Sequence, residues 1–232
     1  MILSRLALNP RSHETVRDLS DCQQLHRTIM SAFPQSSGPA RADFSVLFRV
    51  EYPRAAAPAL LVQSLCRPDW SRLPSGYLLG IPQEKDIAGA YAAVGNGAIL
   101  RFKLRANPTR RIDTKSGPDG ERRNGKRVEL RTESAQLDWL RRKGLAAGFE
   151  VLSVQASSGV LNVRVNDEGK SRGFRSSGLA ASKARLTFAS VLFEGMLRVT
   201  NADAFREALE KGIGSAKAYG FGLLSVAPAE RI

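Results

Sequence analysis

The order of predicted strands and helices restricts the fold of this chain most, because the same order occurs twice. Residues 2–8 alternate between two faces and are typical of a strand that ends at Asn9-Pro10. A helical segment follows at 20–33, then predicted strands at 44–50 and 60–65. The stretch 69–94 gives no secure helix, but the first third of the chain already indicates an α+β unit.

The helix at 20–33 has clear start and stop signals. Ser20 or Asp21 can cap its first turn, and Pro34 stops it. Its apolar residues recur at helical spacing and predict a buried stripe: Cys22, Leu25, Ile29 and Phe33.

The order repeats after Gly95-Asn96-Gly97, which we interpret as a hinge. The predicted elements are a strand at 99–105, a helix at 134–143, strands at 149–154 and 161–165, one or two strands at 186–199, a helix at 201–211 and a strand at 223–226. We therefore expect two ferredoxin-like (RRM-like) α+β domains in tandem, over residues 1–94 and 98–232. The residues of the two halves do not match, so this is a repeat of structure alone.

Net charge points to a polyanionic partner. Lys and Arg outnumber Asp and Glu by 35 to 22, for a formal net charge of +13. Such a field attracts polyanions and speeds encounter, and nucleic acid is the partner that we expect. An anionic membrane is the competitor, but the chain shows neither a compact basic amphipathic helix nor a lipid-anchor motif.

The sequence gives no support for several other classes of protein: membrane-spanning, secreted and metal-binding proteins. We expect no membrane-spanning segment and no signal peptide. Cys22 and Cys66 form no CxxC pair, which favours a reduced, cytoplasmic setting. His13 and His26 do not combine with them at a usual zinc spacing, so we expect no metal and no cofactor in the site.

Basic residues gather in two segments of the second half. Arg101, Lys103 and Arg105 share one strand face and predict a track for backbone phosphates, and a basic, Gly-containing loop follows at 109–126. The alternative is a solvated strand face with a flexible loop. The candidate RNA-binding residues of this loop and its end are Arg110, Arg111, Lys126 and Arg127.

A polar tongue at 166–182 is the second basic segment. We interpret it as a hairpin that can clasp RNA, with a disordered surface loop as the alternative. Its candidate RNA-binding residues, with one from the preceding strand, are Arg164, Lys170, Arg172 and Arg175.

A glycine-rich stretch at 212–222 joins the last helix to the last strand. Backbone N–H groups in such a loop can cradle phosphate, whereas a helix C-cap followed by a tight turn is the plain structural alternative. The candidate binding residues are Gly212, Gly214, Lys217, Gly220 and Gly222. The stretch is neither a Walker loop nor a dinucleotide fingerprint.

His26 is the one candidate for proton transfer that the residues themselves suggest. It lies beside Leu25 at the margin of the buried stripe, where a histidine can equally be a packing or surface residue. Imidazole is the side chain best suited to acid–base work near neutral pH. His13 is predicted to lie in a loop.

Together these pieces resemble the CasE family of CRISPR-associated endoribonucleases, the RNA-processing subunit of type I-E Cascade. The match spans nearly the whole chain in order. Its blocks are Leu3–Arg11, Arg17–Leu19, Leu25–Thr28, Arg101–Thr109, Gly125–Val128, Val191–Gly195 and the glycine loop through Leu224.

The resemblance implies cytoplasmic, metal-independent cleavage of CRISPR repeat RNA at the base of a stem-loop, leaving a 5′-hydroxyl and a 2′,3′-cyclic phosphate. It also implies that the protein stays bound to the cleaved RNA and to other Cascade subunits, with no membrane partner. The catalytic histidine of the family falls on His26, and Arg27 is a further candidate. Family members often carry Pro-Tyr where this chain has Cys22-Gln23, so Gln23 replaces an assisting tyrosine. A non-cleaving RNA-binding scaffold on the same fold is therefore the alternative.

Overall fold

A computed structural model describes residues 1–36, 38–112, 126–155, 159–176 and 183–229. The first half contains, in chain order, β1 (Ile2–Ala7), α1 (His13–Ser20), α2 (Cys22–Ser31), α3 (Ala40–Asp43), β2 (Leu47–Glu51), β3 (Ala59–Ser64), the 3-10 turn η1 (Trp70–Arg72), β4 (Gln83–Asp86) and α4 (Ala88–Ala92). The second half contains β5 (Ile99–Ala106), β6 (Thr109–Ile112), β7 (Lys126–Glu129), α5 (Glu133–Ala146), β8 (Phe149–Val151), β9 (Val163–Ser176), β10 (Lys183–Val199), α6 (Ala202–Lys211), the 3-10 turn η2 (Lys217–Tyr219) and β11 (Leu224–Pro228).

Both halves form antiparallel sheets with the same strand order. The first sheet runs β2-β3-β1-β4, and the second runs β11-β5-β10-β8 with β9 also paired to β10. When the four strands of each main sheet are numbered in chain order, leaving out β6, β7 and β9, both orders read 4-1-3-2. This is the ferredoxin-like order that we predicted. In the first half the second crossover helix is reduced to η1, and the one α-helix within 69–94 is the five-residue α4, so this stretch gave no secure helical pattern.

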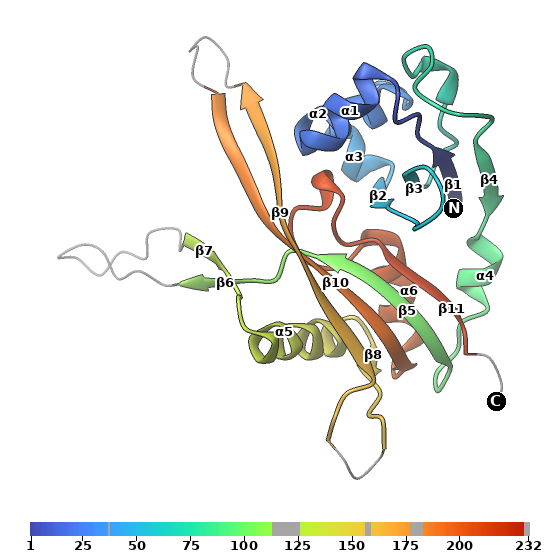
Figure 1. The fold of residues 1–232 in the computed structure, drawn as a ribbon. Coiled ribbons are helices and arrows are strands. Elements are labelled where there is room, and N and C mark those ends of the chain that lie inside the picture. Colours follow the sequence, from blue (N-terminus) through green and yellow to red (C-terminus); the bar gives the residue numbers. More distant parts are fainter. Residues whose placement is uncertain (37, 113–125, 156–158, 177–182, 230–232) are drawn as a thin grey trace.

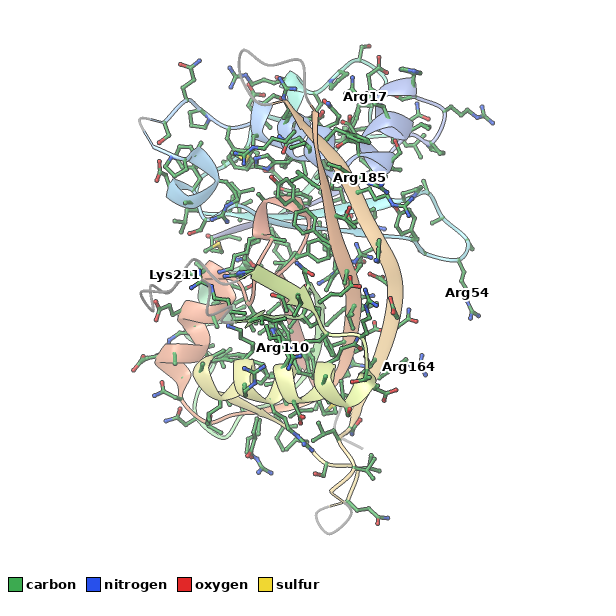
Figure 2. The ribbon with its side chains drawn as sticks, turned by 90° about the vertical axis from the view of Figure 1, so that its left-hand side faces the viewer. Arg17, Arg54, Arg110, Arg164, Arg185 and Lys211 are labelled. Carbon is green, nitrogen blue, oxygen red and sulfur yellow. The ribbon has the colours of Figure 1, made fainter. Side chains whose placement is uncertain are left out.

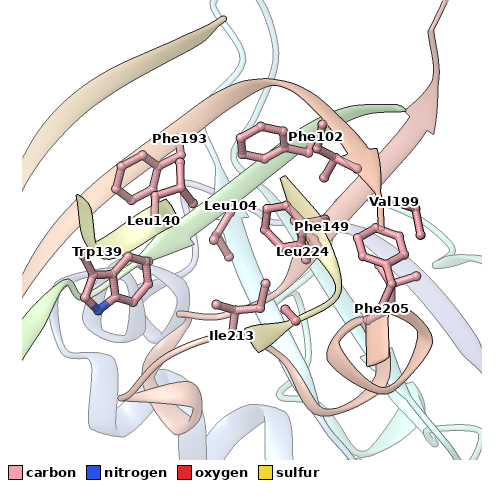
Figure 3. Packing of buried hydrophobic residues seen from close by; sticks show 14 of the residues in the cluster. Phe102, Leu104, Trp139, Leu140, Phe149, Phe193, Val199, Phe205, Ile213 and Leu224 are labelled. Atoms are coloured by element: carbon pink, nitrogen blue, oxygen red, sulfur yellow. The ribbon is translucent and has the colours of Figure 1, made fainter. Parts of the chain in front are cut away.

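Two separate hydrophobic cores lie beneath the two sheets. In the first, Leu25, Ile29 and Phe33 of the predicted stripe pack against β1, β2 and β3. Figure 3 shows the second, in which Trp139, Phe193 and Phe205 pack together with residues of β5 and β11. Tyr91 and Val94 pack against the second core, so helix α4 belongs to it by packing. The division into 1–94 and 98–232 stays a prediction.

Buried hydrogen bonds join the two halves. The guanidinium of Arg49 on β2 is 2% exposed and donates to the carbonyl oxygens of Lys103 and Leu223, at 3.3 and 3.1 Å. The amide of Gln63 on β3 donates to the carbonyl of Leu209 at 2.7 Å and accepts from the hydroxyl of Tyr91 at 2.6 Å. Because buried polar groups must be paired, these contacts fix the halves relative to each other.

Two hairpins project from the second half (Figure 1). Strands β6 and β7 pair from Thr109↔Glu129 to Ile112↔Lys126, so the prediction of a loop over the whole of 109–126 was wrong at both ends. Strands β9 and β10 are far longer than expected and reach the first-half helices. The tongue is therefore a hairpin over its described part, as we interpreted it, and residues 177–182 lie outside the described residues. The short β6–β7 hairpin is called the small hairpin below, and the β9–β10 hairpin is called the long arm.

One prediction about local structure was wrong. His13 is not in a loop but opens α1, where the Ser12 side chain accepts a hydrogen bond from the backbone N–H of Thr15. The prediction of one or two strands at 186–199 is confirmed in its first form, because β10 is one continuous strand at Lys183–Val199. Gly195 lies within this strand, where an added Cβ would clash with the carbonyl oxygen of Asn162.

Candidate active site

Helix α2 places His26 at the junction of the two halves. Asp21 caps the helix by accepting hydrogen bonds from the backbone N–H groups of Gln23 and Gln24, at 2.9 and 3.2 Å. Leu25 and Ile29 anchor the helix in the first core, which leaves His26 at the edge of that core. The helix therefore directs this imidazole toward elements of the second half.

The surroundings of His26 favour the neutral form of its imidazole. Its Nδ1 is buried and makes no hydrogen bond to any residue that the structure describes. Burial, and then the positive charge of Arg41, lower the pKa of His26 below its ordinary value of 6.5. A neutral ring with a free nitrogen can accept a proton at neutral pH.

A pocket of about 630 Å³ opens beside this ring. Arg41 and Arg72 contribute cations to its wall, and Met30, Phe33 and Pro34 contribute apolar surface. The pocket thus offers His26 a space that is large enough for part of a nucleotide and positive on one side.

Gln23 and Arg27 lie within one turn of His26 on the same helix. Gln23 is half-buried and Arg27 is exposed. The long arm closes over the start of this helix at Gly173, where an added Cβ would lie 2.8 Å from a carboxylate oxygen of Asp21 and 3.0 Å from the backbone nitrogen of Gln23. Only glycine allows the arm to approach this closely.

The glycine-rich loop crosses from the second half to the first. Gly212 caps the C-terminal end of α6 with φ +75°. At this position the loop therefore contains the helix C-cap that we gave as the alternative to a phosphate cradle. An added Cβ on Gly212 would lie 2.7 Å from a methyl group of Leu47, and one on Gly220 would lie 3.2 Å from the ring of Phe48. The loop therefore packs tightly on β2 and brings η2 toward α2.

Tyr219 and Lys217 are the side chains that this loop delivers to the site. The rings of Tyr219 and His26 meet edge to face, with centroids 6.0 Å apart. Lys217 is half-buried, and its ammonium donates to the carbonyl of Lys211 at 2.7 Å. Burial, followed by the charges of Arg41, Lys143 and Lys211, lowers the pKa of Lys217.

The predicted phosphate track on β5 is mostly occupied by internal ion pairs. Arg105 makes two hydrogen bonds to the Glu168 carboxylate, at 2.6 and 2.8 Å. Lys103 pairs with Glu194 at 3.1 Å and with Glu51 at 3.7 Å. Arg101 is exposed on the same strand. The face shared by the three cations is thus built into the fold, with Lys103 and Arg105 neutralised by carboxylates.

The small hairpin carries the exposed cations that we expected. Arg110, Arg111 and Arg127 are exposed, whereas the side chain of Lys126 lies outside the described residues. A pocket of about 200 Å³ joins this hairpin to the glycine loop, and its wall includes Arg111, Arg127, Lys143, Gly214 and Ser215. The structure therefore brings two of the predicted basic elements, the hairpin and the loop, to one place.

The long arm carries four further exposed cations, Arg164, Lys170, Arg172 and Arg175. Figure 2 shows Arg164 extending outward from the ribbon. Lys170 pairs with Glu129 of the small hairpin at 3.5 Å, so the two projecting elements are in contact.

Sequence reasoning missed two residues of this site. Tyr219 lies inside the glycine-rich stretch, but nothing in the sequence relates it to His26. Arg41 lies in a short helix after Pro39, in a segment without periodicity. Only the packing of α3 and η2 around α2 reveals either one.

Two classes of feature have no candidate in the described part of the chain. No group of three or more His, Cys, Asp or Glu side chains there could hold a metal ion. No helix there is both long and apolar enough to cross a membrane.

Comparison with known proteins gives matches over nearly the whole chain. The family model described as CRISPR associated protein matches residues 1–228. The chain is 35% identical to the CRISPR-associated endoribonuclease Cse3 of Thermus thermophilus, over 98% of this chain and 100% of that protein. It is 32% identical to the CRISPR system Cascade subunit CasE of Escherichia coli, over 90% and 92%. A solved structure of Cse3 bound to a 19-nucleotide RNA is similar, with a TM-score of 0.78, 34% identity, and coverage of 98% of this chain and 100% of that chain.

Proposed function

Since this chain belongs to the family of CRISPR-associated proteins that includes CasE, we propose that it is an endoribonuclease that processes CRISPR repeat RNA. The relatives support this reading, because one is named an endoribonuclease and another a Cascade subunit. The observation that carries the proposal is the half-buried imidazole of His26 where the two halves meet, with a buried Nδ1 that has no hydrogen-bond partner among the described residues.

The proposed reaction is an internal transfer at one phosphodiester of the repeat, at the 3′ base of its stem-loop. The ribose 2′-oxygen attacks phosphorus and loses its proton to a base, while the P–O5′ bond breaks and the 5′-oxygen takes up a proton. The products are a 2′,3′-cyclic phosphate and a 5′-hydroxyl, with no water consumed. His26 supplies one of these proton transfers. We assign it the base role, in which it accepts the 2′-hydroxyl proton, and the alternative is the acid role, in which it protonates the 5′-oxygen.

RNA binding is assigned to the exposed cations and to the glycine loop. Arg110, Arg111 and Arg127 of the small hairpin reach the phosphates of the stem, and Lys126 belongs with them as a prediction from the sequence. The long arm adds Arg164, Lys170, Arg172 and Arg175, and Arg101 extends the basic surface along β5. Gly212, Gly214, Lys217, Gly220 and Gly222 place the loop beside the scissile linkage. We assign Lys103 and Arg105 to the fold rather than to RNA, because carboxylates already hold them.

Gln23 and Arg27 have smaller parts in this proposal. A glutamine amide can hydrogen-bond to RNA but cannot readily trade a proton, so Gln23 positions rather than transfers. Arg27 is exposed one residue beyond His26 and contacts the RNA backbone. The protein then remains on the product RNA and joins other Cascade subunits through it.

The alternative, a scaffold that binds repeat RNA without cutting it, is favoured by Gln23 alone.

One experiment separates the two functions. The cognate repeat RNA is incubated in EDTA with wild-type protein or with His26→Ala, and the 3′ end of the upstream fragment is analysed for a cyclic phosphate. We expect cleavage only by the wild type, with RNA affinity kept in the variant. If neither protein cuts RNA that both bind, the scaffold function is correct. Equal cleavage by both proteins would remove His26 from the mechanism.

A further inference from the structure

Arg41 is a cation that the structure places at the site without an obvious internal purpose. It lies in α3, and its charge acts on both His26 of α2 and Lys217 of the glycine loop. Its side chain lines the same pocket as His26. Three elements distant in sequence therefore bring a guanidinium, an imidazole and an ammonium group into one neighbourhood.

The guanidinium of Arg41 is poorly satisfied. A guanidinium has five N–H donors, and the described residues provide Arg41 with a single hydrogen bond, from Nη1 to the carbonyl of Val46 at 3.3 Å. Within the described residues it forms no salt bridge, although it is half-buried. Arg49, by contrast, is buried against the carboxylate of Glu51 at 2.8 Å.

A half-buried cation without a counter-ion costs free energy, and a second cation nearby adds to the cost. Burial lowers the pKa of Arg41, and Arg41 in turn lowers that of Lys217. An anion entering the pocket would relieve this repulsion. A phosphodiester fits the need, because a planar guanidinium binds two phosphate oxygens at once.

We infer that Arg41 is a catalytic residue that contacts the scissile phosphate of the RNA and stabilises the charge that develops on it. The inference rests on the proposed function and identifies a group that the sequence did not. As the 2′-oxygen attacks, phosphorus becomes five-coordinate and its non-bridging oxygens gain negative charge. The fixed donors of Arg41 face that charge while His26 accepts the proton, and Lys217 adds a second positive charge. This arrangement needs no tyrosine at position 23.

The test compares Arg41→Gln and Arg41→Lys with the wild type and with Arg54→Gln. Arg54 is a matched control, since it is an exposed arginine that extends outward from the turn between β2 and β3 (Figure 2). Cleavage of repeat RNA is measured as a single turnover with enzyme in excess. Affinity is measured separately with the same RNA carrying 2′-deoxyribose at the cleavage site, and folding is checked by thermal unfolding.

We expect Arg41→Gln to slow the single-turnover step by about 10²–10³-fold, as for the loss of one transition-state donor, with affinity changed by less than about threefold. Arg41→Lys keeps the charge without the planar fork, so it should recover part of the rate. It also serves as the readout if Arg41→Gln does not fold. Arg54→Gln should cleave like the wild type.

Two results would overturn this role while the proposed function stands. In the first, the Arg41 variants cleave the RNA as fast as the wild type. In the second, the variants cleave more slowly, but a higher enzyme concentration restores the full rate. The second result would make Arg41 a binding contact only. If the wild type itself does not cut the RNA, the proposed function fails, and the catalytic role of Arg41 fails with it.

Discussion

Tyr219 contacts the edge of His26 with 6.0 Å between ring centroids and 65° between ring planes. Tyr219 is itself stacked on Phe188 of the long arm, at 4.9 Å and 21°. A row of three rings thus runs from β10 through the glycine loop to helix α2. The second half of the protein holds the imidazole of the first half in place through this row.

Removing the ring of Tyr219 should loosen His26. Aromatic pairs contribute about 0.5–1.5 kcal/mol beyond burial, so we expect Tyr219→Ala to slow single-turnover cleavage by about 2- to 12-fold. Tyr219→Phe keeps the ring contact and should cleave at close to the wild-type rate. An equal loss in both variants would instead place the phenol hydroxyl in the chemistry.

The pH profile should report the lowered pKa of His26. The groups around this ring are Arg41 and Arg72, which line the same pocket, and Tyr219, which contacts the ring edge. Lys217 is close enough to Arg41 for their charges to interact. If neutral His26 is the base, the second-order cleavage constant should rise with pH, bend below 6.5 and stay level up to about pH 8.

The Arg41→Gln variant provides the check on this profile. Removing a neighbouring positive charge favours the protonated ring, so the bend should move up toward the ordinary value of 6.5. A rate that falls as pH rises through this range would make His26 the acid instead.

Gly222 should be the least replaceable glycine of the loop. It has φ +88°, and an added Cβ would lie 2.7 Å from the carbonyl oxygen of Ile213. Gly76 has φ +72° with nothing within 4 Å, so Gly76→Ala measures backbone strain alone, about 1–2 kcal/mol. We expect Gly222→Ala to unfold at lower denaturant than Gly76→Ala and, unlike it, to lose cleavage. Normal cleavage by Gly222→Ala would show that the loop backbone does not position the site.

The exposed cations of the small hairpin should set the salt dependence of RNA binding. Each lost phosphate contact lowers the slope of log affinity against log salt concentration by about 0.7–0.9, so Arg111→Gln and Arg127→Gln should each show a shallower slope than the wild type. Arg198→Gln is the control, because Arg198 pairs with Glu150 at 3.0 Å on another part of the sheet. Slopes that equal the wild-type value would remove this hairpin from the RNA interface.

Arg49 should matter for stability far more than an exposed arginine. Arg49→Met leaves two interdomain carbonyl groups and Ser225 without their donor, which should lower the free energy of unfolding by about 2–4 kcal/mol. Arg67 is 78% exposed in its pair with Glu84, so Arg67→Met should cost less than about 1 kcal/mol. Chemical denaturation measures both, and equal losses would contradict the interdomain role.

The fold was largely predictable because its signals are local. Alternation at 2–8 and the stripe through Leu25 and Ile29 depend on near neighbours, and both elements form where expected. The long arm was not predictable in length, since its polar residues face solvent and its contacts with α1 and α2 join segments that are far apart in the sequence. The 3-10 turn η1 gave no helical pattern because Trp70 anchors it by tertiary packing.

The candidate site was predictable in part. His26 and the glycine loop carry signals in their own residue types. Lys103 and Arg105 are neutralised by carboxylates from three other strands. The alternation of residues along one strand does not indicate which residues of other strands it will pair with. Arg41 was missed for the same reason, because its position beside His26 depends on tertiary packing and leaves no pattern in the sequence.

The hydrogen bonds of Arg49 and Gln63 across the domain junction have a consequence for how substrate is accepted. These buried bonds oppose relative movement of the two halves about residues 95–97, the segment that we interpreted as a hinge. The RNA backbone must therefore change its own conformation to bring the 2′-oxygen, the phosphorus and the 5′-oxygen into line on a rigid protein surface. We expect selectivity among RNAs to reflect how easily each backbone adopts this conformation.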